Sequence, residues 1–191
     1  NTIAAFVSAL AQGADGVELD VMRCGSGEVV VVHDDDLRRV TGGRSALRVR
    51  EAPLAALQEP DLGGGERVPT LAQVLAALPE TALVNVELKS PEPPPGLAGV
   101  RAYVGLAFDD GLAAAVAQVL ALAGRLSPWG DEGTTTLVSS FDPFQLWRFQ
   151  QLVGDALPLG YLFESGQAKP LREAWPARVL GPAALHPEAA L

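Results

Sequence analysis

The sequence predicts an α/β protein in which strands and helices alternate along the 191 residues. Two observations carry this prediction. Runs of β-branched residues, which favour strands, alternate with segments whose apolar residues recur at helical spacing. Most connections between successive strands suit right-handed βαβ units, and 48% of the residues are hydrophobic, which is enough for one substantial core.

The first elements are a helix and a hairpin. Residues 2–12 carry apolar side chains at helical spacing and are followed by Gly13, a common residue at the end of a helix. Residues 16–22 and 29–32 both have the composition of strands. The segment between them, Cys-Gly-Ser-Gly-Glu, is far too short for a parallel crossover. The two strands must therefore pair as an antiparallel hairpin.

The remaining elements alternate between helix and strand. Asp142 followed by Pro143 is typical of a helix start, with an N-cap and a proline at the first helical position. We expect further helices over 71–78, 112–123, 143–153 and 170–175, further extended segments over 82–89, 135–141, 157–163, 178–180 and 184–186, and a proline-rich loop over 90–99.

The number of strands indicates an incomplete barrel. A closed (β/α)8 barrel usually needs about 250 residues, and this sequence supplies fewer than eight convincing strands. We therefore predict one domain over residues 1–191 that forms a (β/α)8 barrel incomplete at its N- and C-terminal ends. The alternative is an open sheet.

The charge and composition exclude several classes of function. The net charge is −9 with a pI of about 4.6, which argues against nucleic-acid binding because that role needs a basic face. An anionic substrate would be repelled unless a cation or a local cluster of lysine and arginine residues intervened. The single cysteine, Cys24, excludes an intrachain disulfide and a cysteine-rich zinc site. No apolar run is long enough for a transmembrane segment. A cytoplasmic location is favoured over a secreted or periplasmic one, and the oligomeric state stays open.

Two carboxylates stand in the first strand, where a buried strand would favour neither. Glu18 and Asp20 share one face of this strand, and the apolar residues that alternate with them share the other. Folding the hairpin about Gly25–Ser26 pairs residues whose numbers add up to roughly 51–53. His33 is therefore expected opposite Glu18 to Asp20, within cross-strand contact range.

A later strand repeats this polar face. Asn85, Glu87 and Lys89 alternate with apolar residues in the segment 82–89. Buried carboxylates without a counter-charge would cost several kcal/mol each or remain protonated. A hard divalent cation relieves this cost, and Mg²⁺ or Ca²⁺ suits carboxylates better than zinc does. Because active sites of α/β barrels lie at the carboxyl ends of the strands, these residues form a candidate metal site.

Each candidate also has a structural interpretation. A single buried acid is more often a hydrogen-bonded structural residue, but two strands with inward acids and an adjacent histidine favour a site. His33 alone could be an edge-strand histidine, Lys89 could simply pair with Glu87, and the alternative for Phe141 is core packing. We expect a structural strand-end role for His186. The acidic run 34–36 is expected to be a solvated loop.

Taken together, the motifs resemble those of the glycerophosphodiester phosphodiesterases. The matching segments, in the order of that family, are NTIAAF (1–6), GADGVELDV (13–21), VVVVHDDDLRRVTG (29–42), VPTLAQVL (68–75), VNVELKS (84–90), SSFDP (139–143) and LHP (185–187). The resemblance covers nearly the whole chain. It implies a TIM-barrel hydrolase that uses a divalent cation to cleave glycerophosphodiesters to glycerol 3-phosphate and an alcohol.

The resemblance also implies roles for individual residues. Glu18, Asp20 and Glu87 would bind the metal, His33 would be one member of a histidine acid/base pair, Lys89 would help hold the phosphate, and Phe141 would line the alcohol side. The family's His-Arg-Gly motif, which carries the other histidine, and its Trp-Thr-Val-Asn-type strand are absent from these residues. A chain without the first histidine should be inactive or nearly so. Two alternatives stay open: a non-catalytic barrel that binds a metal or a phosphoester, and a related lyase acting on choline phospholipids.

Overall fold

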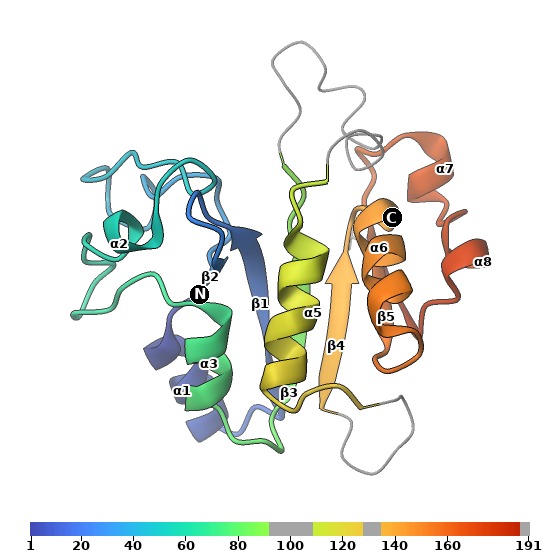
Figure 1. The fold of residues 1–191 in the computed structure, drawn as a ribbon, viewed down its shortest axis with the longest axis horizontal. Helices are drawn as coiled ribbons and strands as arrows, with labels where there is room; N and C mark the ends of the chain where they lie inside the picture. Colours follow the sequence, from blue (N-terminus) through green and yellow to red (C-terminus); the bar gives the residue numbers. More distant parts are fainter. Residues whose placement is uncertain (92–108, 128–134, 188–191) are drawn as a thin grey trace.

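The computed structural model describes residues 1–91, 109–127 and 135–187 (Figure 1). Most of the proline-rich segment predicted over 90–99 lies outside these ranges. The strands are β1 (Gly16–Arg23), β2 (Val29–Val31), β3 (Leu83–Leu88), β4 (Thr136–Ser140), β5 (Leu159–Phe163) and β6 (Ala184–Pro187). The helices are α1 (Ile3–Ala11), α2 (Leu54–Leu57), α3 (Leu71–Ala77), α5 (Leu112–Leu122), α6 (Pro143–Val153), α7 (Lys169–Arg172) and α8 (Ala177–Leu180).

The strands form one six-stranded sheet in the order β2-β1-β3-β4-β5-β6. The β1–β2 pair is antiparallel, and every other neighbouring pair is parallel. With β2 at one edge and β6 at the other, the sheet does not close on itself. The fold is therefore α/β with a largely parallel sheet, consistent with the predicted incomplete barrel.

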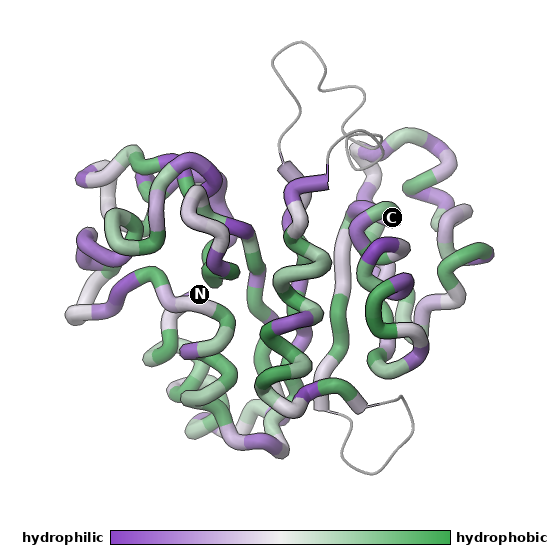
Figure 2. Tube along the Cα trace, in the orientation of Figure 1, coloured by the Kyte–Doolittle hydropathy of each residue, from purple (hydrophilic) through white to green (hydrophobic). Residues whose placement is uncertain are grey.

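Helices α1, α3, α5 and α6 cover one face of this sheet and create the main core. Alternate residues of the parallel strands, such as Leu19, Val86, Val138 and Tyr161, are fully buried against helices α1, α3, α5 and α6. Figure 2 shows hydrophobic residues concentrated along these strands and helices, and hydrophilic stretches in the loops beyond the strand ends. Because side chains alternate along a strand, the polar residues between these apolar positions face the other side of the sheet.

The hairpin has the predicted register. Val21 lies opposite Val31 and Met22 opposite Val30, so the paired numbers add up to 52. The turn requires glycine: a Cβ at Gly25 would lie 2.5 Å from the carbonyl oxygen of Glu51, and Gly27 has φ +105. This turn reverses the chain at the carboxyl end of β1, so β2 runs back along β1 and brings Val32 beside Asp20.

Two short helices differ from the sequence-based expectation. Residues 178–180 were expected to be extended, but they belong to α8, which begins after Pro176 in a helical conformation and ends at the left-handed Gly181. Four residues are too few to show helical periodicity, so only these two flanking residues carried a signal. Helix α2 follows Pro53 and was not predicted.

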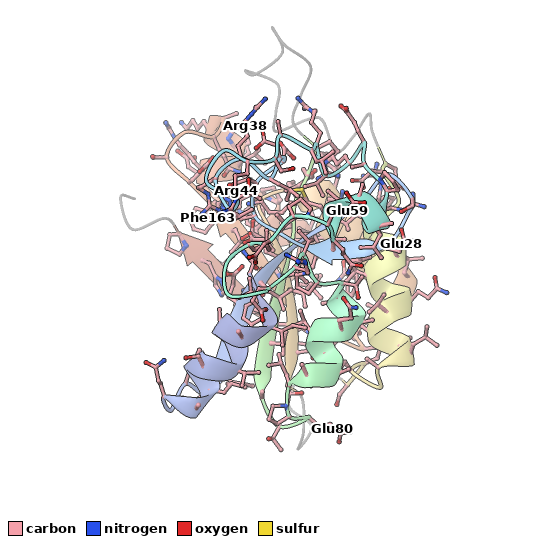
Figure 3. All side chains as sticks on the ribbon, turned by 90° about the vertical axis from the view of Figure 1, so that its left-hand side faces the viewer. Glu28, Arg38, Arg44, Glu59, Glu80 and Phe163 are labelled. Carbon is pink, nitrogen blue, oxygen red and sulfur yellow. The ribbon has the colours of Figure 1, made fainter. Side chains whose placement is uncertain are left out.

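Loops at the carboxyl ends of the parallel strands and loops at their amino ends have different roles. In Figure 3, Arg38 and Arg44 lie on the loops at one end of the molecule, and Glu80, which precedes β3, lies at the opposite end. At the latter end, the buried Arg125 donates hydrogen bonds to the carbonyl groups of Pro79 and Glu80 and so fixes the entry to β3.

The longest described helices, α5 and α6, have 11 residues each, and none of the described helices could span a membrane.

Candidate metal centre and active site

Strands β1 and β3 bring three carboxylates together on the polar face of the sheet. These strands pair in parallel, with Asp20 beside Glu87 and Glu18 beside Asn85. One oxygen from each of Glu18, Asp20 and Glu87 lies within 4.8 Å of the other two. Asp20 is buried, Glu87 is partly buried and Glu18 is exposed. The structure thus places the three predicted ligands in one cluster, which we call the carboxylate cluster.

Lys89 stands over this cluster at the end of β3. Its Nζ atom lies 3.2 Å from Glu87 Oε1 and 3.4 Å from Asp20 Oδ1. Its backbone is held on both sides: the Lys89 N–H donates to the Val21 carbonyl at 3.1 Å, and Arg50 Nη2 donates to the Lys89 carbonyl at 2.8 Å. The ammonium therefore has a fixed position beside the carboxylates.

Asn1 also contacts the carboxylate cluster. Its side-chain Nδ2 donates to Asp20 Oδ2 at 2.9 Å, and the Asp20 N–H donates back to Asn1 Oδ1 at 3.2 Å. Asn1 begins the family-like segment NTIAAF, from which no role of its side chain was predicted. A polar residue directly before the N-cap Thr2 was the only available signal. The paired hydrogen bonds orient the Asp20 carboxylate.

Burial and mutual repulsion perturb the acids of the cluster. Burial by surrounding protein atoms, followed by the charges of Asp20 and Glu87, raises the pKa of Glu18 to about 7, although this residue retains accessible surface. Burial likewise raises the pKa of Glu87, with Lys89 opposing it. Burial lowers the pKa of Lys89, but Glu87 and Asp20 outweigh this effect and raise it overall. One lysine thus compensates the three carboxylates incompletely.

The carboxylate cluster suits a hard divalent cation. Its donors are all oxygen atoms, and they come close enough to share one ion. Burial and the neighbouring carboxylates raise the pKa of Glu18, and a bound cation would offset this repulsion. Glu18, Asp20 and Glu87 would hold the ion, and Mg²⁺ and Ca²⁺ both fit this donor set.

His33 lies near the cluster but outside the hairpin ladder. The Val32 N–H still donates to the Asp20 carbonyl at 2.9 Å, whereas β2 itself ends at Val31. The His33 side chain is 55% exposed, so it points less deeply inward than cross-strand pairing predicts. It is close enough that its positive charge opposes the raised pKa of Glu18.

The two remaining candidates are Phe141, directly after β4, and His186, on β6. Phe141 follows β4 at the same end of the sheet as Lys89, and its carbonyl accepts a hydrogen bond from Gln167 at 3.2 Å. His186 lies on β6 opposite Leu162, at the edge of the sheet away from β1. The structure therefore does not bring His186 to the carboxylate cluster.

The acidic run Asp34–Asp35–Asp36 differs from the solvated loop that was expected. Arg39 pairs with Asp34 at 2.5 Å and Arg38 pairs with Asp36 at 2.9 Å. Asp35 faces Arg50 at 3.7 Å. The partners are two to fifteen residues away, so composition alone does not reveal this pairing. We call these three pairs the arginine-matched loop.

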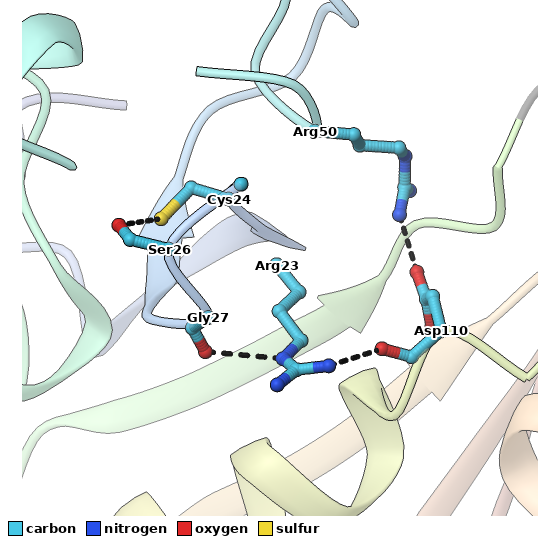
Figure 4. A pocket seen from close by; sticks show the side chains of 7 residues that line it. Arg23, Cys24, Ser26, Gly27, Arg50 and Asp110 are labelled. Carbon is cyan, nitrogen blue, oxygen red and sulfur yellow. Dashed lines mark hydrogen bonds and ion pairs between the residues drawn. The ribbon is translucent and has the colours of Figure 1, made fainter. Parts of the chain in front are cut away.

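A pocket of about 290 Å³ lies beside the Lys89 backbone (Figure 4). It is lined by Arg23, Cys24, Gly25, Ser26, Gly27, Arg50 and Asp110. Arg50 pairs with the Asp110 carboxylate, and Arg23 donates to the carbonyls of Asp110 and Gly27. These contacts tie the hairpin turn to the residues before α5, so the pocket supports the site rather than presenting free charges to a substrate.

The whole chain, residues 1–191, matches the glycerophosphoryl diester phosphodiesterase family. The protein belongs to this family. It is 31% identical over 178 residues to a glycerophosphodiester phosphodiesterase from Caldanaerobacter subterraneus subsp. tengcongensis, and the match covers 89% of this chain and 63% of that relative. The chain therefore spans less than two thirds of the length of this relative.

Solved structures of the family share the fold. An Oleispira antarctica phosphodiesterase in complex with sn-glycerol-3-phosphate has 29% identity and a TM-score of 0.71, with 98% of this chain and 68% of that chain covered. A glycerophosphodiester phosphodiesterase from Thermotoga maritima has 26% identity and a TM-score of 0.64, with 98% and 66% covered. The incomplete barrel of this chain thus corresponds to about two thirds of these chains.

Proposed function

We propose that this protein hydrolyses glycerophosphodiesters to glycerol 3-phosphate and an alcohol with the help of a divalent cation. The observation that carries this proposal is the carboxylate cluster, in which Glu18, Asp20 and Glu87 approach within 4.8 Å beneath Lys89 in a chain of this family. The sn-glycerol-3-phosphate in the Oleispira antarctica structure supports the choice of substrate class. We also propose that residues 1–191 form a single barrel domain.

The residues of the site divide the chemistry between them. A divalent cation held by Glu18, Asp20 and Glu87 supplies charge stabilisation at the phosphate oxygens when it is bound. Lys89 adds a second positive charge where the phosphate would lie, which an acidic protein needs in order to attract a phosphodiester. His33 is the group that moves a proton, either from the attacking water or to the leaving alcohol. Phe141 lines the alcohol side of the site.

The test is hydrolysis of a glycerophosphodiester by the full-length protein with and without EDTA. We expect EDTA and Glu18→Ala each to abolish turnover, and Asp36→Ala, which removes a paired carboxylate, to leave it intact. His33→Ala should lower turnover more than it lowers cation affinity. Unchanged rates with EDTA and with Glu18→Ala would show that the metal role is wrong.

The products distinguish the alternatives. Hydrolysis releases glycerol 3-phosphate, whereas a lyase would leave a cyclic phosphate. A protein that binds the cation and the phosphodiester without turnover would be a binding module. Either of these results would replace the proposed activity while keeping the carboxylate cluster as the cation site.

A further inference from the structure

The loop after β2 contains a chain of contacts that ends on the His33 ring. His33 Nδ1 lies 2.7 Å from Asp34 Oδ1. The other oxygen of the same carboxylate, Asp34 Oδ2, accepts a hydrogen bond from Arg39 Nε at 2.5 Å. Three side chains within seven residues are thus connected in the order guanidinium, carboxylate, imidazole.

The protonation state of Asp34 determines the direction of its contact with His33. The hydrogen bond from Arg39 lowers the pKa of Asp34, so this carboxyl group is ionised at neutral pH. An ionised carboxylate can only accept hydrogen bonds. His33 Nδ1 must therefore carry the proton in this contact. In a neutral imidazole the other nitrogen, Nε2, then has the free lone pair.

We propose that Asp34 and Arg39 are positioning residues that hold the His33 imidazole in its Nδ1–H tautomer, with Nε2 free to exchange a proton with the substrate. This inference rests on the proposed role of His33 in hydrolysis. It adds two residues, which do not touch the substrate themselves, to the acid/base machinery.

Because His33 is exposed, the contacts with Asp34 and Arg39 are needed to orient its ring. Its side chain is 55% exposed, so core packing does not fix the orientation of the ring. Asp34 is only 27% exposed and is itself held by Arg39. Glu18 on β1 and Glu87 on β3 are also near enough to His33 for their pKa values to be lowered when the ring is protonated. The Asp34 contact is the one that engages a defined ring nitrogen.

The neighbouring pair provides a matched control. Arg38 and Asp36 form an ion pair at 2.9 Å in the same loop, with exposures close to those of the Arg39–Asp34 pair. No contact of Asp36 with His33 is seen among the described residues. A change in Asp34 or Arg39 should therefore affect His33, and the corresponding change in Asp36 or Arg38 should not.

The direct test is ¹⁵N NMR of the two histidines in protein labelled on the imidazole nitrogens. The chain has only His33 and His186, and the signal lost in His33→Gln identifies His33. Spectra are recorded at increasing pH until the shifts no longer change, so that the neutral ring is observed. We expect wild-type His33 to show a protonated Nδ1 and an unprotonated Nε2. An Nε2–H tautomer in the wild-type protein would overturn the proposal without any variant having to fold.

The variants then test which residues are responsible. Asp34→Ala should shift His33 toward the Nε2–H tautomer, and Arg39→Gln should do so partly, whereas Asp36→Ala and Arg38→Gln should leave the spectrum unchanged. The His186 signal serves as the internal reference for folding. An unchanged His33 tautomer in Asp34→Ala would overturn the proposal.

Kinetics separate this inference from the proposed function. Asp34→Ala should lower kcat of the full-length protein by about tenfold with KM little changed, far less than the roughly 10⁴-fold loss when a Ser-His-Asp triad loses its buried aspartate, because Asp34 is partly exposed. If His33→Ala keeps full turnover, the proposed function of His33 fails, and the Nδ1–H assignment is judged by the spectrum alone. An equal loss in Asp34→Ala and Asp36→Ala would show a structural effect and overturn the positioning role.

Discussion

Two acidic regions lie close together in this protein, and they are compensated in opposite ways. In the arginine-matched loop, Asp34 and Asp36 each have an arginine of their own, and Asp35 faces Arg50, which also pairs with Asp110. In the carboxylate cluster, Lys89 pairs with two carboxylates at once, and Glu18 has no ion pair among the described residues. The acids are consecutive in the first region, but in the second they come from two strands.

This difference shows that the density of acids along the chain does not mark a cation site. The acidic run in the loop is the most concentrated in the sequence, yet Arg39 and Arg38 pair with two of its three carboxylates. The carboxylate cluster keeps uncompensated negative charge, and burial together with that charge raises the pKa of Glu18 to about 7. A cation site is expected where acids converge without enough counter-charge.

The largest expected effect is the loss of a carboxylate from the cluster. Glu87→Ala in the full-length protein should lower kcat/KM by at least about a thousandfold, since a metal contributes several kcal/mol to transition-state stabilisation. Initial rates of glycerophosphodiester hydrolysis measure this effect. Asp36→Ala is the matched control, and a comparable loss in both variants would contradict the distinction between the two regions.

Loss of Lys89, the lysine beside the carboxylate cluster, should change activity and cation affinity in opposite directions. Lys89→Met removes the positive charge that lies 3.2 Å from Glu87, so the cluster should bind a cation several-fold more tightly. The same variant should raise KM about tenfold or more because the phosphate loses a charged partner. Calorimetric titration with Ca²⁺ and steady-state kinetics test the two parts, and weaker cation binding would show that Lys89 does not oppose the ion.

The pH dependence of stability provides a smaller effect with a defined sign. The pKa of Glu18 in the folded state is about 7, above its ordinary value of 4.5. Its contribution to stability is therefore fully present below about pH 4.5 and is lost as the pH rises through about 7. Without a cation, Glu18→Gln should have nearly the wild-type Tm at low pH and a higher Tm at pH 8. Equal melting temperatures at all pH values would contradict the raised pKa.

The smallest effect is expected in the arginine-matched loop. Arg38→Gln breaks an exposed ion pair and should change the free energy of unfolding by less than about 1 kcal/mol. Chemical denaturation measures this change, and cation affinity should be unaffected. A larger loss would contradict the description of this pair as an exposed surface contact.

Most of the fold and the carboxylate cluster could be predicted from the sequence because local rules determine them. The short turn between β1 and β2 leaves antiparallel pairing as the only option, and strand alternation puts Glu18, Asp20 and Glu87 on one face. The prediction of an extended segment over residues 178–180 was wrong, because a four-residue helix such as α8 carries almost no periodic signal.

The contacts that surround the site could not be predicted in the same way. Arg50 reaches the carbonyl of Lys89 across 39 residues, and Asn1 reaches Asp20 across 19. Such contacts depend on the path of loops in three dimensions, which residue spacing does not encode. The pairing of Asp34 with Arg39 is local, but the choice among several nearby arginines depends on how the loop bends.

The most direct measurement is the Tm of the EDTA-treated protein as Mg²⁺ or Ca²⁺ is added, compared among wild type, Glu87→Gln and Asp36→Asn. At a cation concentration on the order of 100 times Kd, binding adds about 2.7 kcal/mol of stability, which corresponds to a rise of roughly 5–10 °C. If the carboxylate cluster binds the cation, the Tm should rise in wild type and in Asp36→Asn, and the rise should be lost in Glu87→Gln. No rise in wild type, or an equal rise in all three proteins, would contradict a cation site at Glu18, Asp20 and Glu87.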